Sequence, residues 1–312
     1  MASTGAQSTL STTISFMMTT SSLLNTTNSS NKSADDYHTP LLAIYSVVLI
    51  CGTISLSLMM HIMKSSTTSA TSIAVLNLIF AHFIFLLTVP FRIYYYAGHE
   101  WKLSHEWCKM VSSMIHIHMY MSFILYVIIL ITRLLTFYHK AEPVVSFRRN
   151  HALLASALVW IAVIVIVPCI IYFIYGKKKE GPKINGTLRC FDFGKSIEST
   201  KVFNYITSIL IILISIVLTA LQAIVLWVLY RKHRQGCTSQ QDFAAQLKSL
   251  CFALIMVVCF IPYHVFRLFY LEDIELQNIN EVFLSLTTFN CLDMLTFLGR
   301  RTCNICFSGR AI

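Results

Sequence analysis

"YVIILITRLLTFYHK", residues 126–140, ends a long apolar run and contains one arginine, Arg133. A charge at the centre of a bilayer is costly. Cys108 precedes Arg133 by 25 residues, and a helix of that length rises about 37 Å at about 1.5 Å per residue. Because the hydrocarbon core of a bilayer is about 30 Å thick, the two residues are expected at opposite membrane surfaces. The guanidinium group of Arg133 would then reach water or a partner.

Apolar runs of this kind recur along the chain. The protein has 312 residues, of which 56% are hydrophobic and only 12% are charged, less charge than a soluble domain carries on its surface. A helix that crosses a bilayer needs about 20 apolar residues. Seven runs come near that length, and they lie at Leu41–Met63, Thr71–Tyr96, Trp107–Thr136, Ala152–Ile174, Val202–Leu229, Leu247–Leu271 and Val282–Leu298. The sequence therefore predicts an all-α membrane protein, a bundle of seven transmembrane helices.

Four N-glycosylation sequons indicate the orientation of this bundle. Three precede the first predicted helix and one lies between the fourth and the fifth, and with seven spans these segments share one side of the membrane. The acceptor residues are Asn25, Asn28, Asn31 and Asn185. We expect the N-terminus outside and the C-terminus inside the cell. Residues 1–40 would form an extracellular glycosylated tail, 41–298 the membrane domain and 299–312 a short cytoplasmic tail.

The charge pattern favours membrane lipids as partners. The formal net charge is +10, and in this topology the excess lies on the cytoplasmic face, where anionic headgroups would attract it. Nucleic acid is not an expected partner, because the basic residues are divided among short loops. Cys303 and Cys306 near the inner surface are candidate palmitoylation sites. His116 and His118 are two positions apart and cannot chelate one metal together, and the sequence predicts no metal, no cofactor and no enzymatic activity.

Several motifs occur in the order and at the spacing of one membrane-protein family. They are Trp101, Cys108, Thr132-Arg133-Leu134, Trp160, Cys190, Cys259-Phe260-Ile261-Pro262 and the segment from Asp293 to Phe297. In this set the chain resembles the rhodopsin-like (class A) G-protein-coupled receptors. The resemblance implies a disulfide bond between Cys108 and Cys190 and a multi-pass location in the plasma membrane. It also implies an extracellular ligand and coupling to heterotrimeric G proteins.

The resemblance implies which residues carry activation, and the chain departs from the family in some of them. The set is Arg133, Phe260, Pro262, Asp293 and Phe297. The family's acid before the arginine is Thr132 here, so a charge-assisted hydrogen bond worth about 1.5–3 kcal/mol would be absent. Higher basal activity is therefore expected, unless another group takes the place of the acid. Met294 and Phe297 replace a proline and a tyrosine, which leaves a weakly coupling decoy or modulatory membrane binding protein as the alternative function.

Basic and polar side chains near the outer ends of the second, third and sixth helices form the predicted ligand site. They are Arg92, His116, Tyr263, His264 and Arg267. His264 and Arg267 are three positions apart and face one side of a helix, and this pattern after Pro262 resembles nucleotide receptors. Ile115 stands where aminergic receptors hold an acid. An anionic small molecule is the expected ligand, and the alternative is that the basic groups only extend to the membrane surface. The ligand's identity and the G-protein class stay open.

A polar core is expected at mid-membrane. In the family an aspartate in the second helix, a serine in the third and polar residues of the seventh hold a sodium ion, and the resemblance places His82, Ser122 and Asp293 there. Sodium prefers oxygen ligands, so little sodium dependence is expected. The second and seventh helices are neighbours in this fold. His82 and Asp293 are therefore expected to meet, since a pair is cheaper to bury than either ion alone.

Overall fold

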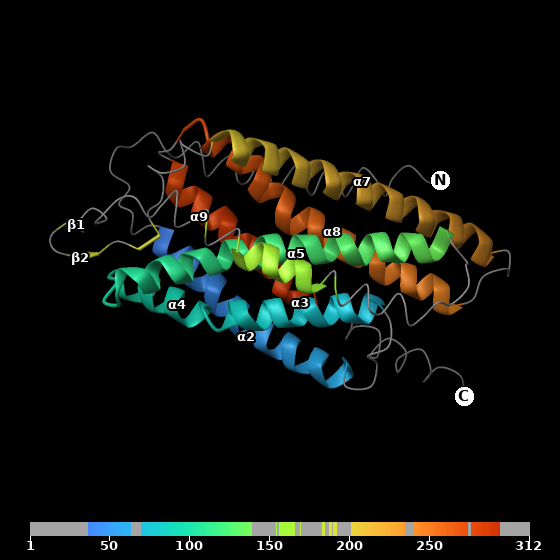
Figure 1. Cartoon of the computed structure of the whole chain (residues 1–312), viewed down its shortest axis with the longest axis horizontal. Coiled ribbons are helices and arrows are strands. Elements are labelled where there is room, and N and C mark those ends of the chain that lie inside the picture. Colours follow the sequence, from blue (N-terminus) through green and yellow to red (C-terminus); the bar gives the residue numbers. More distant parts are fainter. Residues whose placement is uncertain are drawn as a thin grey trace. The chain divides into compact units, whose positions relative to one another are not determined.

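Figure 1 shows a computed structural model of the chain. The structure describes residues 37–63, 70–138, 154, 156–165, 169, 183–184, 187–188, 190–191, 201–234, 240–273 and 276–293. The predictions for the four sequons, for Phe297 and for the cysteines Cys303 and Cys306 lie outside these residues.

The described residues are mainly helical, as the sequence predicts. The α-helices are α2 (His38–Met63), α3 (Ala70–Leu86), α4 (Val89–Gly98), α5 (His105–Tyr138), α7 (Lys201–Arg234), α8 (Gln240–Tyr270) and α9 (Gln277–Leu286), and α9 continues into the 3₁₀ helix η5 (Thr287–Leu292). Two short strands, β1 (Lys183–Ile184) and β2 (Thr187–Leu188), form an antiparallel pair.

Five segments are long and apolar enough to cross a membrane. They are His38–His61, Ser72–Gly98, His105–Leu135, Lys201–Arg231 and Gln246–Tyr270. A shorter apolar helix, Ser156–Val165, lies within the fourth predicted run. Trp160 of this helix donates from Nε1 to Oδ1 of Asn77 at 3.0 Å, which joins it to α3.

The second predicted run, Thr71–Tyr96, contains two helices rather than one. Pro90 lies at the start of α4; it has no N–H to donate, and its ring would clash with the carbonyl group four residues earlier in a continuous helix. The Thr88 hydroxyl donates to the carbonyl oxygen of Phe85 at 2.7 Å and closes the turn. The predicted run is confirmed as one apolar span, Ser72–Gly98, and the break inside it sets the direction in which α4 presents Arg92.

The last helix tightens into 3₁₀ geometry before it reaches Asp293. The hydroxyls of Thr287 and Thr288 donate to the carbonyl oxygens three residues before them, at 2.6 and 2.5 Å. Side chains three apart are eclipsed in a 3₁₀ helix, so Asn290 lies above Asp293 and Thr288 lies above Cys291. All of these side chains are buried. The 3₁₀ turns thus direct two neighbouring ridges of polar side chains into the core.

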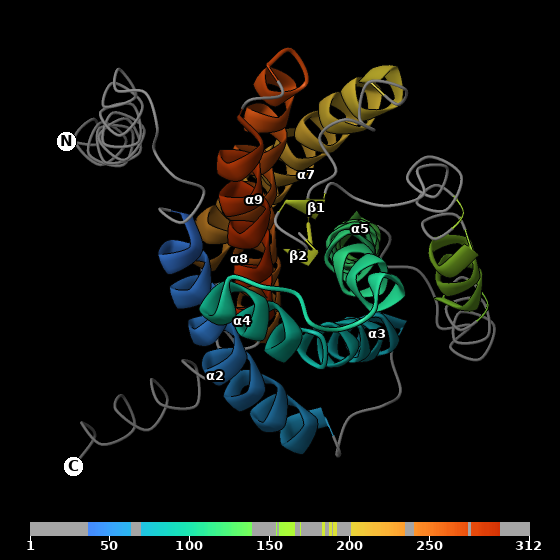
Figure 2. The same ribbon diagram turned by 90° about the vertical axis from the view of Figure 1, so that its left-hand side faces the viewer.

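α5 is the helix around which the site is organised. It lies between α3 and α8 and also contacts α7 and η5, and Figures 1 and 2 show this arrangement from two sides. α7 lies along α8, and α2 contacts α3, α4 and η5. Polar side chains of α3, α4, α5, α8 and α9 therefore converge on a common interior.

Candidate functional site

A buried arginine on α4 is the first unusual feature of this interior. Arg92 is only 1% exposed. Its Nη1 donates to the hydroxyl of Tyr45 at 3.1 Å and its Nη2 to the carbonyl oxygen of Val111 at 3.2 Å. Its Cζ lies 4.5 Å from the ring centroid of Phe191, within cation–π distance. Among the described residues, no carboxylate forms a salt bridge with Arg92.

A second arginine lies on α8, one turn beyond a histidine. Arg267 donates to the hydroxyl of Tyr263 and, from Nη2, to Oδ1 of Asn204 at 2.7 Å. Nδ1 of His264 lies 3.2 Å from the hydroxyl oxygen of Ser208. Asn204 and Ser208 both belong to α7, so the predicted common face of His264 and Arg267 is confirmed. The two residues face α7.

His116 and Glu281 join these residues into one group. His116 interacts electrostatically with both Arg92 and Arg267. Glu281 on α9 also interacts with both arginines, and its Oε2 is buried with no hydrogen-bond partner among the described residues. We call Arg92, His116, Tyr263, His264, Arg267 and Glu281 the arginine cluster. Glu281 was not among the predicted residues of this site.

A loop residue covers one side of the arginine cluster. Cys190 is bonded to Cys108 at the start of α5, with their Cα atoms 5.7 Å apart, which confirms the predicted disulfide. Phe191 follows with φ of 70°, a conformation that is unusual for a bulky residue. Its ring stacks on Tyr96 with centroids 5.8 Å apart and lies against Arg92. The disulfide thus holds an aromatic ring over the buried guanidinium group.

A second polar group lies on α3, α5 and the end of η5. Nε2 of His82 lies 3.4 Å from Oδ2 of Asp293, so the predicted meeting of these two residues is confirmed. The hydroxyl of Tyr126 donates to the same carboxylate oxygen at 2.5 Å. Nδ1 of His82 lies 2.9 Å from Nε2 of His118, and Sγ of Cys291 lies 3.7 Å from the first nitrogen and 3.5 Å from the second. We call these five residues the histidine cluster.

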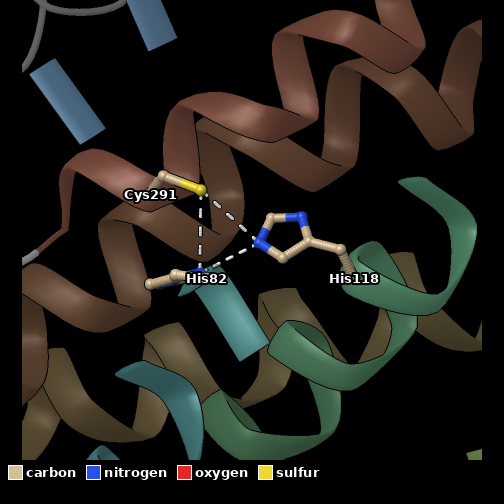
Figure 3. Close-up of side chains that lie close together, drawn as sticks. All are labelled: His82, His118 and Cys291. Carbon is tan, nitrogen blue, oxygen red and sulfur yellow. Dashed lines mark hydrogen bonds between the residues drawn. The ribbon is translucent and has the colours of Figure 1, made fainter. Parts of the chain in front are cut away.

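Figure 3 shows that His82, His118 and Cys291 point toward one another from three helices, α3, α5 and η5. All five residues of the histidine cluster are buried. Ser122, the third predicted member of the polar core, is buried as well, but its hydroxyl has no hydrogen-bond partner among the described residues. The structure therefore joins His82 to His118, Cys291 and Tyr126 rather than to Ser122.

The residues expected to carry activation lie along α5 and α8. Phe260 is fully buried and meets the rings of Phe123 and Tyr126 edge to face, with centroids 5.7 and 6.2 Å apart. Tyr126 links Phe260 to Asp293. Pro262 lies inside α8, which continues through it without interruption. Arg133 is half-buried near the end of α5, and no salt bridge joins it to a described carboxylate.

Comparison with known proteins assigns this architecture to a family. The family model "7 transmembrane receptor (rhodopsin family)" matches residues 55–296. "Probable G-protein coupled receptor 141" of Homo sapiens is 39% identical over 282 residues, which cover 86% of this chain and 91% of that protein. The chain belongs to the rhodopsin family of seven-transmembrane receptors. Short stretches such as HIHMYMSF, residues 116–123, resemble the human receptor, and the comparison confirms that similarity.

More distant relatives are receptors too. "Probable G-protein coupled receptor 34" of Pan troglodytes is 24% identical over 278 residues, 83% of this chain and 72% of that protein. A purinoceptor of Gallus gallus is 26% identical over 159 residues, 50% of this chain and 42% of that protein. The predicted function, a G-protein-coupled receptor, is confirmed, and the alternative of a weakly coupling decoy is not favoured. The family is one of membrane receptors and not of enzymes.

Three side chains of these two clusters were not predicted as site residues from the sequence. His118 and Cys291 contact His82, and Glu281 interacts electrostatically with both arginines. His118 is four residues before Ser122, so both occupy one face of α5, and this spacing was a usable signal. Cys291 had no such signal, because its direction depends on the 3₁₀ turns of η5. For Glu281 the sequence shows only a charged residue directly before an apolar run, which does not predict its partners.

Proposed function

We propose that the receptor binds a small anionic molecule at the arginine cluster and activates heterotrimeric G proteins through Arg133. It lies in the plasma membrane as a multi-pass protein with its N-terminus outside. Residues 1–40 form a tail glycosylated at Asn25, Asn28 and Asn31, 41–298 the receptor domain and 299–312 a cytoplasmic tail. Asn185 is also glycosylated, Cys303 and Cys306 are palmitoylated, and anionic lipids meet the basic cytoplasmic face.

The observation that carries the ligand class is the environment of Arg92. A buried charge without an opposite charge in contact is expensive, and an ionised residue at membrane depth is by default a functional feature. The hydrogen bonds of Arg92 go to neutral oxygen atoms, so its positive charge is not neutralised by a carboxylate in contact. A carboxylate, phosphate or sulfonate group beside Arg92 would supply the missing charge.

Glu281 limits where such an anion binds. Its carboxyl group interacts with both Arg92 and Arg267, so it competes with the ligand for the same positive charges. A ligand must therefore compete with Glu281 for the charge of the arginines, or bind on the side of Arg92 that faces Phe191 and Tyr45. One relative is named a purinoceptor, which makes a purine nucleoside diphosphate a sensible first probe.

A chain of contacts leads from the arginine cluster toward the other end of α5. Tyr263 of the arginine cluster and Phe260 lie on the same helix, three residues apart. Phe260 meets Tyr126, which donates to Asp293. A ligand that shifts α8 would therefore disturb the contacts between α8, α5 and η5. Arg133 is then available to the G protein, because no salt bridge to a described carboxylate holds it.

The test is a signalling screen with three classes of anion: a purine nucleoside diphosphate, a lysophospholipid and a fatty acid. Cells expressing the receptor are assayed with sensors for each G-protein class. The active anion should lose at least about tenfold in potency in Arg92→Gln, as expected when a charge-assisted hydrogen bond is removed. Lys102→Ala, which removes an exposed basic side chain, is the matched control and should keep its potency. Equal losses in both variants would indicate diffuse surface attraction and contradict the proposal.

A further inference from the structure

The histidine cluster contains donor atoms of a kind that the sodium site of the family does not use. His82, His118 and Cys291 offer two imidazole nitrogens and one sulfur, all buried and all within 4.8 Å of one another. Nitrogen and sulfur ligands suit zinc and similar transition metals, whereas sodium, magnesium and calcium prefer oxygen. No spacing in the sequence predicts this set of ligands, because its members come from three helices.

The distances match a tetrahedral zinc site closely. With Zn–N of about 2.0–2.1 Å and Zn–S of about 2.3 Å, two ligand nitrogens lie about 3.3 Å apart, and a nitrogen and a sulfur about 3.5 Å apart. The two nitrogens of His82 and His118 are 2.9 Å apart, and the sulfur of Cys291 lies 3.5 and 3.7 Å from them. Shifts of about 0.4 Å or less would bring the three atoms to metal-binding geometry.

Asp293 and Tyr126 orient the first ligand. Oδ2 of Asp293 lies 3.4 Å from Nε2 of His82 and accepts a hydrogen bond from the hydroxyl of Tyr126 at 2.5 Å. A carboxylate at this position favours the proton on Nε2, which leaves the lone pair on Nδ1 directed at His118 and Cys291. A carboxylate behind a histidine is the usual second partner of a metal-binding imidazole. Asp293 is therefore a positioning residue for this cluster.

The second histidine is also held in place. The ring of Phe85 stacks on that of His118, with centroids 4.2 Å apart and planes 14° apart. Nε2 of His118 faces the cluster, and its Nδ1 has no hydrogen-bond partner among the described residues. The ring is fixed by stacking and by its approach to His82. In a metal complex it would bind through Nε2.

The charges balance when a divalent ion binds. The thiol of Cys291 would lose its proton to solvent and bind as a thiolate, while the two histidines bind in the neutral form. One thiolate and the carboxylate of Asp293 then neutralise the two positive charges of the ion. This matters because an uncompensated charge is costly to bury.

From these observations we propose that His82, His118 and Cys291 bind a zinc ion, which joins α3, α5 and η5 at the place of the family's sodium site. Three protein ligands leave one coordination position for a further small ligand. Binding stabilises the described arrangement of the three helices and opposes any change that separates them. Zinc therefore acts as a modulator of the receptor. The proposal departs from the expectation, drawn from the sequence, that there is no metal site.

The experiment uses the full-length receptor, purified in detergent, treated with a chelator and returned to buffer containing zinc. We expect a single bound zinc ion per receptor and a zinc-dependent rise in the unfolding temperature. Magnesium, calcium and sodium should produce no such rise. Cobalt in place of zinc should give a thiolate-to-metal charge-transfer band, which reports directly on the sulfur ligand.

Variants decide between this site and nonspecific binding. Cys291→Ser should lose the cobalt band and lower the zinc affinity at least about tenfold, and Asp293→Asn should lower it about 10–100-fold, as for other second-sphere partners. Cys259→Ser, which removes another buried thiol, should leave both unchanged. If Cys291→Ser fails to fold, the zinc affinity of His118→Gln and the cobalt spectrum of the wild type test the site instead. Wild-type zinc affinity in Cys291→Ser or His118→Gln, or no cobalt band in the wild type, would overturn the proposal. These measurements need no G protein, so failure here leaves the proposed function untouched.

Discussion

The arginine cluster and the histidine cluster share the helix α5 but bury charge in opposite ways. At the arginine cluster, neutral oxygens and aromatic rings surround Arg92. Glu281 interacts with it electrostatically, and no salt bridge joins the two residues in the part of the chain that the structure describes. At the histidine cluster, the carboxylate of Asp293 is in contact with His82 and with the hydroxyl of Tyr126. The first arrangement is suited to binding an anionic ligand from outside. The second is suited to stabilising the fold or to binding a cation.

The sharpest test of this contrast is to remove one charge from each cluster. Asp293→Asn should lower the free energy of unfolding by about 3–5 kcal/mol, because it removes one partner of a buried pair. Arg92→Met should change it by about 1 kcal/mol or less, since an apolar side chain replaces a charge that has no carboxylate in contact. Thermal unfolding of the two purified variants measures both values. Similar losses in the two variants would remove the distinction between the clusters.

The disulfide should matter to one cluster and not to the other. Cys108→Ser should cost about 2–4 kcal/mol and reduce surface expression, because Cys190 and Phe191 would no longer be held over Arg92. Zinc-dependent stabilisation of the protein that does fold should persist, since the histidine cluster contains no loop residue. The measurements are surface labelling of cells and thermal unfolding with and without zinc.

Cys169→Ser, which removes an exposed free cysteine, is the control for Cys108→Ser and should behave as the wild type. A loss of both the ligand response and the zinc effect in Cys108→Ser would mean that the two clusters fold as one unit.

Replacing the histidine by an acid should convert the histidine cluster into an oxygen site. The wild type should show little sodium dependence. In His82→Asp, sodium at about ten times its Kd would add about 1.4 kcal/mol of stability, and zinc binding should fall. The comparison replaces sodium with an inert large cation at constant ionic strength. A saturable sodium effect in the wild type, lost in Asp293→Asn, would show that the histidine cluster is not selective against hard cations.

The smallest effect is expected at the exposed ends of α7 and α8. Glu272 accepts hydrogen bonds from Lys201, at 2.8 Å, and from Tyr205, and these bonds hold its pKa below the ordinary value of 4.5. A carboxyl group whose pKa is lower in the folded state adds stability above pH 4.5, and this is lost as pH falls through the folded pKa. Because Glu272 is exposed, solvent weakens the contribution. Glu272→Gln should remove only a slight part of the fall in unfolding temperature on acidification.

The helices and every residue of the arginine cluster except Glu281 were predicted, because the signals are local. Apolar run length marked the spans, and the three-residue spacing of His264 and Arg267 gave their common face. The break before Pro90 follows from local chemistry too, although run length alone conceals it. The pairing of His82 with Asp293 came from the resemblance to the family.

The rest depended on how distant segments pack. Cys291 reaches His82 and His118 because the hydroxyls of Thr287 and Thr288 help tighten the last helix, and a 3₁₀ turn in place of an α-turn is not visible in an apolar run. Glu281 interacts with Arg92 and Arg267 only after three helices have packed. Contacts between helices have no fixed spacing in sequence, so a metal-ligand pattern search cannot find the histidine cluster.

The central claim is that the protein is a receptor that activates G proteins through Arg133, and basal signalling tests it most directly. The wild type, Arg133→Ala and Thr132→Asp are expressed at equal surface density and assayed with sensors for every G-protein class. The wild type should signal above receptor-free cells in at least one channel. Thr132→Asp should lower that signal by restoring an acidic partner for Arg133, and Arg133→Ala should abolish it. Equal, background-level signals from the wild type and Arg133→Ala would contradict the claim.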